Sequence, residues 1–307
     1  MWETLPLNRT LVRLPLVLCL MALVLPVAKS GPEPCMVQLL EEPGEIGIAY
    51  DPFSPSPVME TVPLRLMNLS SGHCDLLLET VIPGVGTRQM ELAGSGVLAE
   101  FVLGSSEAES RGLSGSRLRL SIAPEDARSA ELGIRLEPGA FPSPGVYPEE
   151  VRFRVRDAAT ERPLLDDILV RFDVEVLSRA RINIAGSHGS RARRPGTTLV
   201  DLGELQTGME RDVPVHIHAN EAYSLTIESE NRGELRHVQR PELPAVSYSV
   251  GLHGQWSDLG TPMMLRMHRP PTIRGEFLPL RIRIGETQGL MAGTYRDRVH
   301  VTVDALH

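Results

Sequence analysis

A His-x-His pair is the feature of this sequence that could most directly do chemistry. His216 and His218 lie in the run 213–218, and two histidines at this spacing can hold a metal ion. The alternation of the run directs Val215 and Ile217 to one face of a strand and both histidines to the other, outward face. No third ligand is apparent in the sequence, so we predict no metal site.

Motifs for other chemistries are incomplete. Gly84-Val85-Gly86 lacks the rest of a dinucleotide-binding loop and the helix that should follow it, so we interpret it as a turn. The sequence has no Gly-x-Ser-x-Gly motif, and no spacing singles out a pair of carboxylates. We therefore expect no catalytic residue, no cofactor and no enzyme activity.

The first thirty residues predict a secretory signal peptide. Arg9 and Arg13 give it a positive start, the run 14–27 is apolar, and small residues suit cleavage near Ser30. A retained membrane anchor is the alternative, but the apolar run is short for a bilayer and prolines interrupt it. We expect the mature protein to start near residue 31 and to be exported.

Cys35 and Cys74 are the only cysteines after that leader. An exported compartment permits a disulfide between them. The bridge would close a loop of about 40 residues and stabilise the fold by about 4 kcal/mol in the chain-entropy model. The alternative is a pair of free thiols, which export makes less favourable.

The charge of the chain argues against a nucleic-acid partner. The formal net charge is −8, whereas phosphate backbones require a basic surface. Arginines at 191, 193 and 194 form one local basic run, but the glycines and proline around them indicate a solvated loop.

Short segments in which apolar and polar residues alternate indicate an all-β protein. These strands and their turns must position the histidines, cysteines and other residues named above. A period of two places one face of each segment in a core and the other in water. Several such strands separated by turn residues are typical of an immunoglobulin-like β-sandwich. The clearest segments are 62–66, 118–122, 151–155, 280–284 and 299–303.

An internal repeat divides the mature chain into two domains. A strand, a loop with a tyrosine and a second strand occur in the same register around Tyr147 and again around Tyr295. We predict two β-sandwich domains, at 31–177 and 178–307. Each tyrosine follows a small-residue turn, so we expect its ring to cover the end of the core and its hydroxyl to meet a backbone carbonyl at the corner.

The two copies differ at their carboxyl ends. The first continues into the alternating segment 168–176, whereas only residues 304–307 follow Val303 in the second. We therefore expect the second domain to lack its last strand and to expose core side chains beside unpaired backbone groups. A strand from another chain would fill this groove. We place the groove between the final and first strands of the domain, at Val299, Val301, Val303, Ile182 and Ile184.

The start of the mature chain offers no strand in return. Only residues 31–34 precede Cys35, which is too little to fill the groove of a partner. We expect the chain to accept a strand and to donate none, a combination that suits the end of a linear fibre.

The run 292–299 (AGTYRDRV) closely resembles the carboxyl-terminal signature of spore coat protein U domains, the pilin-like domains of archaic chaperone–usher fimbriae. The runs 199–205 and 222–230 resemble the early strand with its turn and the central hairpin of these domains. The run 49–53 and the cysteine pair resemble the first domain of two-domain tip subunits. The resemblance implies a periplasmic chaperone, an outer-membrane usher and a neighbouring pilin as partners.

Our leading hypothesis is a fimbrial tip subunit at the cell surface that acts as an adhesin and accepts a donor strand through its second domain. The first domain would contact a surface or receptor that the sequence does not identify, through loop residues Val81, Ile82, Val85, Leu164 and Leu165. The alternatives are a secreted spore-coat-like or biofilm matrix protein, a periplasmic pilus chaperone and an enzyme. The lack of lysine after the leader counts against a chaperone, which keeps a basic anchor in its cleft.

Overall fold

The structure of the chain, a computed structural model, consists of strands and their connections. It describes residues 34–82, 89–105, 116–184, 196–270 and 274–306. The expected all-β class is confirmed, and no helix that could cross a membrane was found in these ranges. The predicted signal peptide, Val85 and the arginines at 191, 193 and 194 lie outside the described residues.

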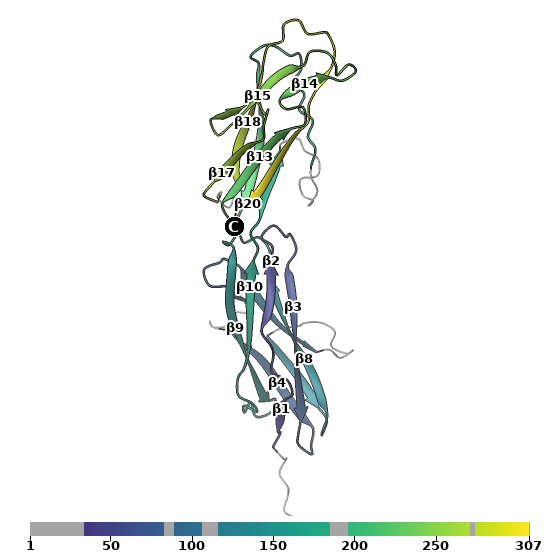
Figure 1. Ribbon diagram of the computed structural model, residues 1–307. Coiled ribbons are helices and arrows are strands. Elements are labelled where there is room, and N and C mark those ends of the chain that lie inside the picture. Colours follow the sequence, from purple (N-terminus) through teal and green to yellow (C-terminus); the bar gives the residue numbers. More distant parts are fainter. Residues whose placement is uncertain (1–33, 83–88, 106–115, 185–195, 271–273, 307) are drawn as a thin grey trace, which may run out of the picture. The chain divides into compact units, whose positions relative to one another are not determined.

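Two five-stranded sheets form the first sandwich (Figure 1). Its strands are β1 (Val37–Leu39), β2 (Ile46–Tyr50), β3 (Val58–Asn68), β4 (Cys74–Val81), β5 (Gln89–Glu91), β6 (Leu98–Ser105), β7 (Arg117–Ile122), β8 (Ala127–Leu136), β9 (Gly145–Asp157) and β10 (Ile168–Val176). One sheet has the order β1-β3-β8-β6-β5, and the other has the order β2-β10-β9-β4-β7.

Apolar residues at every second position of these strands fill the first core. In β10, Val170, Phe172 and Val174 are fully buried, while Arg171 between them is exposed. Phe172 meets Phe101 of β6 edge to face, with the ring centroids 5.9 Å apart. The last strand of this sandwich therefore supplies side chains to the middle of its core and links the two sheets.

Two sheets also form the second sandwich. Its strands are β11 (Ala180–Ile184), β12 (Glu210–Ala219), β13 (Tyr223–Ser229), β14 (Glu234–His237), β15 (Val246–Leu252), β16 (Gln255–Ser257), β17 (Met263–Met267), β18 (Glu276–Ile284), β19 (Tyr295–Arg296) and β20 (Val299–Ala305). The larger sheet has the order β11-β12-β18-β15-β14-β19 with β16 beside β15, and the smaller has the order β17-β13-β20. Tyr223 and Tyr248 lie among aliphatic residues in its core.

The repeated tyrosines form matching corners, Tyr147 at the start of β9 and Tyr295 in β19 just before β20. The hydroxyl of Tyr147 donates a hydrogen bond to the carbonyl of Ser143 at 2.8 Å, and that of Tyr295 donates to the carbonyl of Met291 at 2.9 Å. Each acceptor lies four residues before its tyrosine. The two strands therefore leave their corners in the same way.

The segment 199–205 is not a strand, so the expectation drawn from the resemblance is wrong there. In chain order this segment lies between β11 and β12, as β2 lies between β1 and β3, and β2 pairs in parallel with β10. The described part of the second sandwich has no strand in the place of β10, so this segment has no ladder to join, although Leu202 and Leu205 pack on the core. The run 222–230 is also not a hairpin, because it contains the single strand β13 and the start of a turn.

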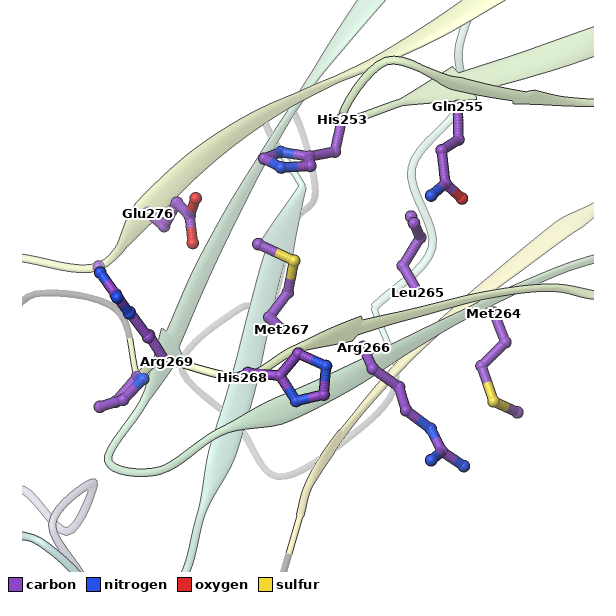
Figure 2. Close-up of a pocket in the computed structure, with 11 residues that line it drawn as sticks. His253, Gln255, Met264, Leu265, Arg266, Met267, His268, Arg269 and Glu276 are labelled. Atoms are coloured by element: carbon purple, nitrogen blue, oxygen red, sulfur yellow. The ribbon is translucent and has the colours of Figure 1, made fainter.

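β17 borders a hollow of about 700 Å³ in the second sandwich (Figure 2). The hollow is lined by β17, by residues 268–270 and 275 that follow it, by the first residue of β18, and by His253 and Gln255 of the β15–β16 hairpin. The methionines that mark this segment in the sequence differ in burial: Met263 is buried, Met267 is half-buried and Met264 is 60% exposed.

Candidate functional site at the outer edge of β20

The final strand of the second sandwich has a free edge where its counterpart in the first has none. β9 pairs with β4 on one side and with β10 on the other. β20 pairs with β13, with Val299 opposite Ser229 and Ala305 opposite Tyr223, and no other strand of the described chain pairs with it. The edge that faces away from β13 is called the outer edge of β20 below.

Alternate residues of β20 direct their backbone groups to this outer edge. Arg298 and Leu306, which flank the strand, hydrogen-bond to the β13 side through their main chains. In an antiparallel pair the bonded residues alternate, so the even-numbered residues face β13. The N–H and C=O groups of Val299, Val301 and Val303 therefore point to the outer edge.

The same valines are incompletely covered. Each is half-buried, whereas Val151 and Val155 at the matching positions of β9 are 2% and 1% exposed. The difference follows from β10, whose side chains close the first core beside β9. Hydrogen-bonding capacity and apolar surface are thus available together on the outer edge of β20.

Ile182 and Ile184, which the sequence places across the gap, lie in β11. This strand pairs with β12 in the larger sheet and approaches β20 without sharing a ladder with it. Both isoleucines are half-buried and, like the valines of β20, pack against the second core. The structure therefore brings the predicted groove residues to one core, on strands from both sheets.

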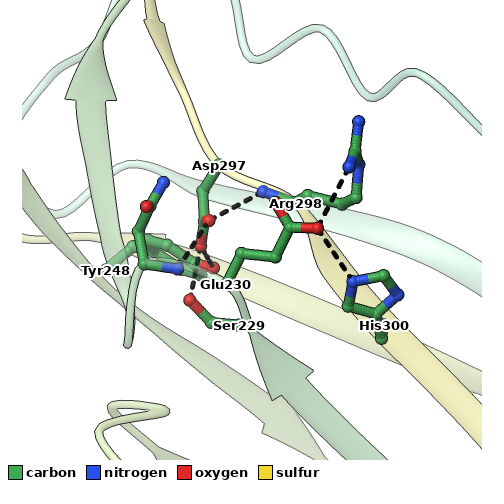
Figure 3. A network of polar contacts seen from close by, with 7 residues as sticks. Ser229, Glu230, Tyr248, Asp297, Arg298 and His300 are labelled. Carbon is green, nitrogen blue, oxygen red and sulfur yellow. Dashed lines mark hydrogen bonds and ion pairs between the residues drawn. The ribbon is translucent and has the colours of Figure 1, made fainter. Parts of the chain in front are cut away.

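A carboxylate holds the start of β20 in place (Figure 3). Asp297 lies between β19 and β20, and it accepts hydrogen bonds from the hydroxyls of Ser229 and Tyr248. It also accepts bonds from the backbone amides of Asn231 and Arg298, at 3.1 and 2.7 Å. One side chain thus connects the start of β20 to β13, to the turn that follows β13 and to β15. These contacts preorganise the strand for pairing.

Burial and hydrogen bonds to carboxylates also change the titration of two tyrosines in this sandwich. Burial raises the pKa of Tyr248 well above its ordinary value, and the hydrogen bond to Asp297 raises it further. Burial and then the 2.9 Å hydrogen bond to Glu276 raise the pKa of Tyr223 in the same way. Both phenols therefore stay neutral donors over the whole physiological range of pH.

An exposed polar cluster occupies the face of β20 that points away from the core. Glu230 accepts hydrogen bonds from Arg298 at 3.0 Å and from His300 at 3.1 Å, as Figure 3 shows. The bond from His300, followed by that from Arg298, lowers the pKa of Glu230. Because these side chains leave the sheet on its outward face, they do not obstruct a strand that pairs in the plane of the sheet.

Gly293 of the signature run sits where no side chain fits. Its φ is 158°, and a Cβ atom there would collide with the imidazole of His237. His237 is buried, and its Nδ1 accepts hydrogen bonds from the backbone amides of Gln239 and Arg240 at 3.2 and 3.1 Å. The glycine therefore lets the corner at Tyr295 close against this ring, whose centroid lies 5.2 Å from that of the tyrosine.

The other predicted site residues belong to the first sandwich. Cys35 and Cys74 form the expected disulfide, with their Cα atoms 5.6 Å apart. Of the loop residues predicted for adhesion, Ile82, Leu164 and Leu165 are half-buried and pack against the first core, and Val81 ends β4. This packing uses part of their apolar surface, and their role in adhesion stays a prediction.

The outward histidines of β12 stack on other rings. His216 lies face to face with Phe277, with centroids 3.9 Å apart, and its Nε2 is 2.9 Å from the carbonyl oxygen of Arg274. Burial, followed by the charges of His216 and Arg181, lowers the pKa of His218. Within the described ranges, no group of three or more His, Cys, Asp or Glu residues is placed to hold a metal ion.

Asp297 is the residue of this site that reasoning from sequence overlooked. It stands in the signature run, yet nothing in the pattern assigns it a partner. A signal existed, because an aspartate just before a strand often accepts backbone amides of a neighbouring turn. Ser229 and Tyr248 carry no such signal, since only the fold brings them to Asp297.

No protein-family model matches this sequence, and no curated protein matches it. Solved structures do match. A chain of the CsuC–CsuE chaperone–tip adhesion subunit complex from archaic chaperone-usher Csu pili of Acinetobacter baumannii is 15% identical, with 87% of this chain and 99% of that chain covered and a TM-score of 0.42. CfaE, the adhesive subunit of CFA/I fimbria of enterotoxigenic Escherichia coli, is 13% identical, with 86% and 93% covered and a TM-score of 0.34.

A family 123 glycoside hydrolase from Clostridium perfringens also matches, at 12% identity over 47% of this chain and 27% of that chain, with a TM-score of 0.27. Similarities at these levels transfer neither a family nor a function to this chain.

Proposed function

We propose that this chain is a fimbrial subunit whose second sandwich accepts an extended strand from a neighbouring pilin along the outer edge of β20. The observation that carries the proposal is the coincidence of outward backbone groups and half-buried side chains at Val299, Val301 and Val303. An added strand would pair with the backbone groups and cover the valines, so that hydrogen bonding and apolar burial favour the same event.

The first sandwich supplies a pattern for the incoming strand. β10 pairs with β9 in antiparallel fashion, with Val170 opposite Val151 and Ile168 opposite Phe153. Its apolar residues alternate with polar ones and enter the core. A strand with the same alternation would suit β20, because β9 and β20 leave matching corners.

The finer proposal places the subunit at the fimbrial tip. There the first sandwich, which β10 closes, would face outward and contact a surface as an adhesin. A periplasmic chaperone would protect the outer edge of β20 before assembly, and an outer-membrane usher would export the subunit to the cell surface. The resemblance of the run 292–299 to pilin-like domains supports this route.

Strand acceptance is tested with the full chain and a synthetic peptide that copies Ile168–Val176. Hydrogen exchange is followed at the amides of Val299, Val301 and Val303 with and without the peptide. We expect these amides to become protected, because the peptide completes the ladder, and we expect the melting temperature of the second sandwich to rise. Amides that exchange slowly without peptide and ignore its addition would exclude the proposal.

Two matched controls make the test specific. A peptide with serine at the positions of Val170, Phe172 and Val174 should give no protection. The variant Val301→Asp puts a charge in the apolar row and should abolish protection, whereas Thr302→Asp on the outward face of the same strand should retain it. Pairing between copies of the chain at this edge, without peptide, would favour the alternative of a secreted matrix protein.

A further inference from the structure

The small sheet of the second sandwich has a second open edge, on β17. β17 pairs with β13 from Met263 to Met267, and no other described strand pairs with it. Since the even-numbered residues of β13 face β20, its odd-numbered residues face β17. Leu225 therefore bonds with Leu265, and the backbone N–H and C=O groups of Met264 and Arg266 point outward.

The hollow of about 700 Å³ lies along this edge. In Figure 2, Leu265 and Met267 turn toward the side of His253, while Met264 and Arg266 leave the strand on its other side. Leu265 and Met267 also pack on the second core, so they give the hollow an apolar floor. The edge thus offers backbone partners at every second residue beside a space that side chains can enter.

Arginine and histidine side chains outnumber carboxylates around the hollow. Arg266, Arg269, His253 and His268 line it, and the facing carboxylate of Glu276 accepts the hydrogen bond of the Tyr223 hydroxyl. The two arginines against one carboxylate contrast with the chain as a whole, whose formal net charge is −8 with histidines counted as neutral.

His253 also has a backbone conformation that favours glycine. Its φ is 48°, in the left-handed region, and it leads the turn of the β15–β16 hairpin. Gly254 beside it has a φ of 80°, and a two-residue hairpin turn of this kind requires positive φ at both central residues. The turn holds the histidine at the rim of the hollow, on the side opposite to β17.

We propose that the β17 edge and its hollow bind an extended acidic peptide segment of another protein by strand addition. The outward groups of Met264 and Arg266 would pair with the main chain of the segment. Its acidic side chains would meet the surrounding arginines and histidines, and its apolar ones would enter the hollow beside Met267. This partner is additional to the strand proposed for β20, and it binds the opposite edge of the same sheet.

The test uses the full chain and a fluorescent nine-residue peptide that alternates valine with glutamate. We expect saturable binding by fluorescence anisotropy, with weaker binding as salt screens the charges. Hydrogen exchange should slow at the amides of Met264 and Arg266, which the peptide backbone would engage. Two control peptides should not bind: one with lysine in place of glutamate, and one methylated at the amide nitrogens that would face β17.

Variants separate this site from the rest of the sandwich. Arg266→Glu should weaken binding roughly tenfold, because it reverses a charge beside the acidic side chains. Arg211→Glu, a matched change at an exposed arginine of β12, should leave affinity unchanged. Met264→Pro removes an outward N–H from an edge position and should abolish binding. Val301→Asp on β20 should have no effect, which keeps this test independent of the proposed function.

Several outcomes would overturn the inference. Equal binding of the methylated peptide, or competition by free glutamate at similar concentration, would indicate a small-anion site without strand addition. Slower hydrogen exchange at the amide of Val301, and not at that of Met264, would show that the peptide binds β20. If the valine–glutamate peptide does not bind even at low salt, the β17 edge is not a peptide-binding site.

Discussion

The strands β9 and β20 start from matching tyrosine corners and then meet different neighbours. β9 runs between β4 and β10, and its inward side chains are buried. Among the described strands β20 pairs with β13 alone, and its inward valines stay half-buried. One strand therefore decides whether this fold is closed. Without it, backbone groups and apolar surface become available at the same residues.

The two sandwiches also secure these strands by different polar contacts. Glu149, which occupies the position of Asp297 in the first copy, accepts one hydrogen bond from the amide of Ala93 at 2.8 Å. Asp297 accepts bonds from side chains and amides of several segments. The β10 ladder holds β9, whereas a half-buried carboxylate holds the start of β20. The second sandwich thus depends on a polar network close to its open edge.

The largest expected difference between the sandwiches comes from the disulfide. Reducing the Cys35–Cys74 bond, which spans 39 residues, should lower the free energy of unfolding of the first sandwich by about 4 kcal/mol. The reason is the loop-closure entropy that the bond removes from the unfolded state. Urea unfolding followed by hydrogen exchange reads each sandwich separately, and the second should not change. Equal destabilisation of both would contradict independent cores.

Removing the carboxylate at the start of β20 should have the next largest effect. Asp297→Ala leaves the buried hydroxyl of Tyr248 and nearby amides without an acceptor, so we expect a loss of about 3 kcal/mol in the second sandwich. Glu149→Ala, the matched change in the first, should cost about 1 kcal/mol because it removes a single bond. Chemical denaturation measures both, and similar losses would mean that the two corners are equivalent.

Paired valine truncations compare the cores directly. Val151→Ala should cost about 2 kcal/mol, because a fully buried side chain loses its packing. Val299→Ala at the matching position should cost about 1 kcal/mol, because that side chain is half-buried already. Adding the peptide that copies β10 should bury Val299 further, so the cost of Val299→Ala should rise toward that of Val151→Ala. If the two losses match without peptide, the outer edge of β20 is covered in solution.

Alkaline pH should produce the smallest difference. A raised folded-state pKa means that Tyr223 and Tyr248 contribute stability below the unfolded value of about 10, and that this contribution is lost as pH rises beyond it. Each half unit of pH past that point costs at most about 0.7 kcal/mol per tyrosine. Thermal unfolding between pH 9 and 10.5 should show a steeper loss in the second sandwich, which has these two tyrosines, than in the first, where burial raises the pKa of Tyr50.

The variant Tyr248→Phe supplies the control for that experiment. It removes the phenol that donates to Asp297, so the second sandwich should be less stable at neutral pH and less sensitive to base. An unchanged pH profile would show that ionisation of Tyr248 does not control alkaline unfolding.

The sequence by itself determined the class of the fold and much of its strand pattern. Alternation is a local property, and for this reason the predicted segment 168–176 coincides with β10. The comparison of the two copies was enough to predict a second sandwich without a counterpart of β10. The cysteine pair was predictable because only Cys35 and Cys74 remain after the leader.

The tertiary structure alone decided which groups meet across the chain. It brought Asp297 to Ser229 and Tyr248, left β17 as another open edge, and kept 199–205 out of the sheet. A strand exists only where a neighbour offers a ladder, and a carboxylate that is partly withdrawn from water is stable only where donors converge on it. Both conditions depend on how distant segments pack, and no local pattern of residues encodes that packing.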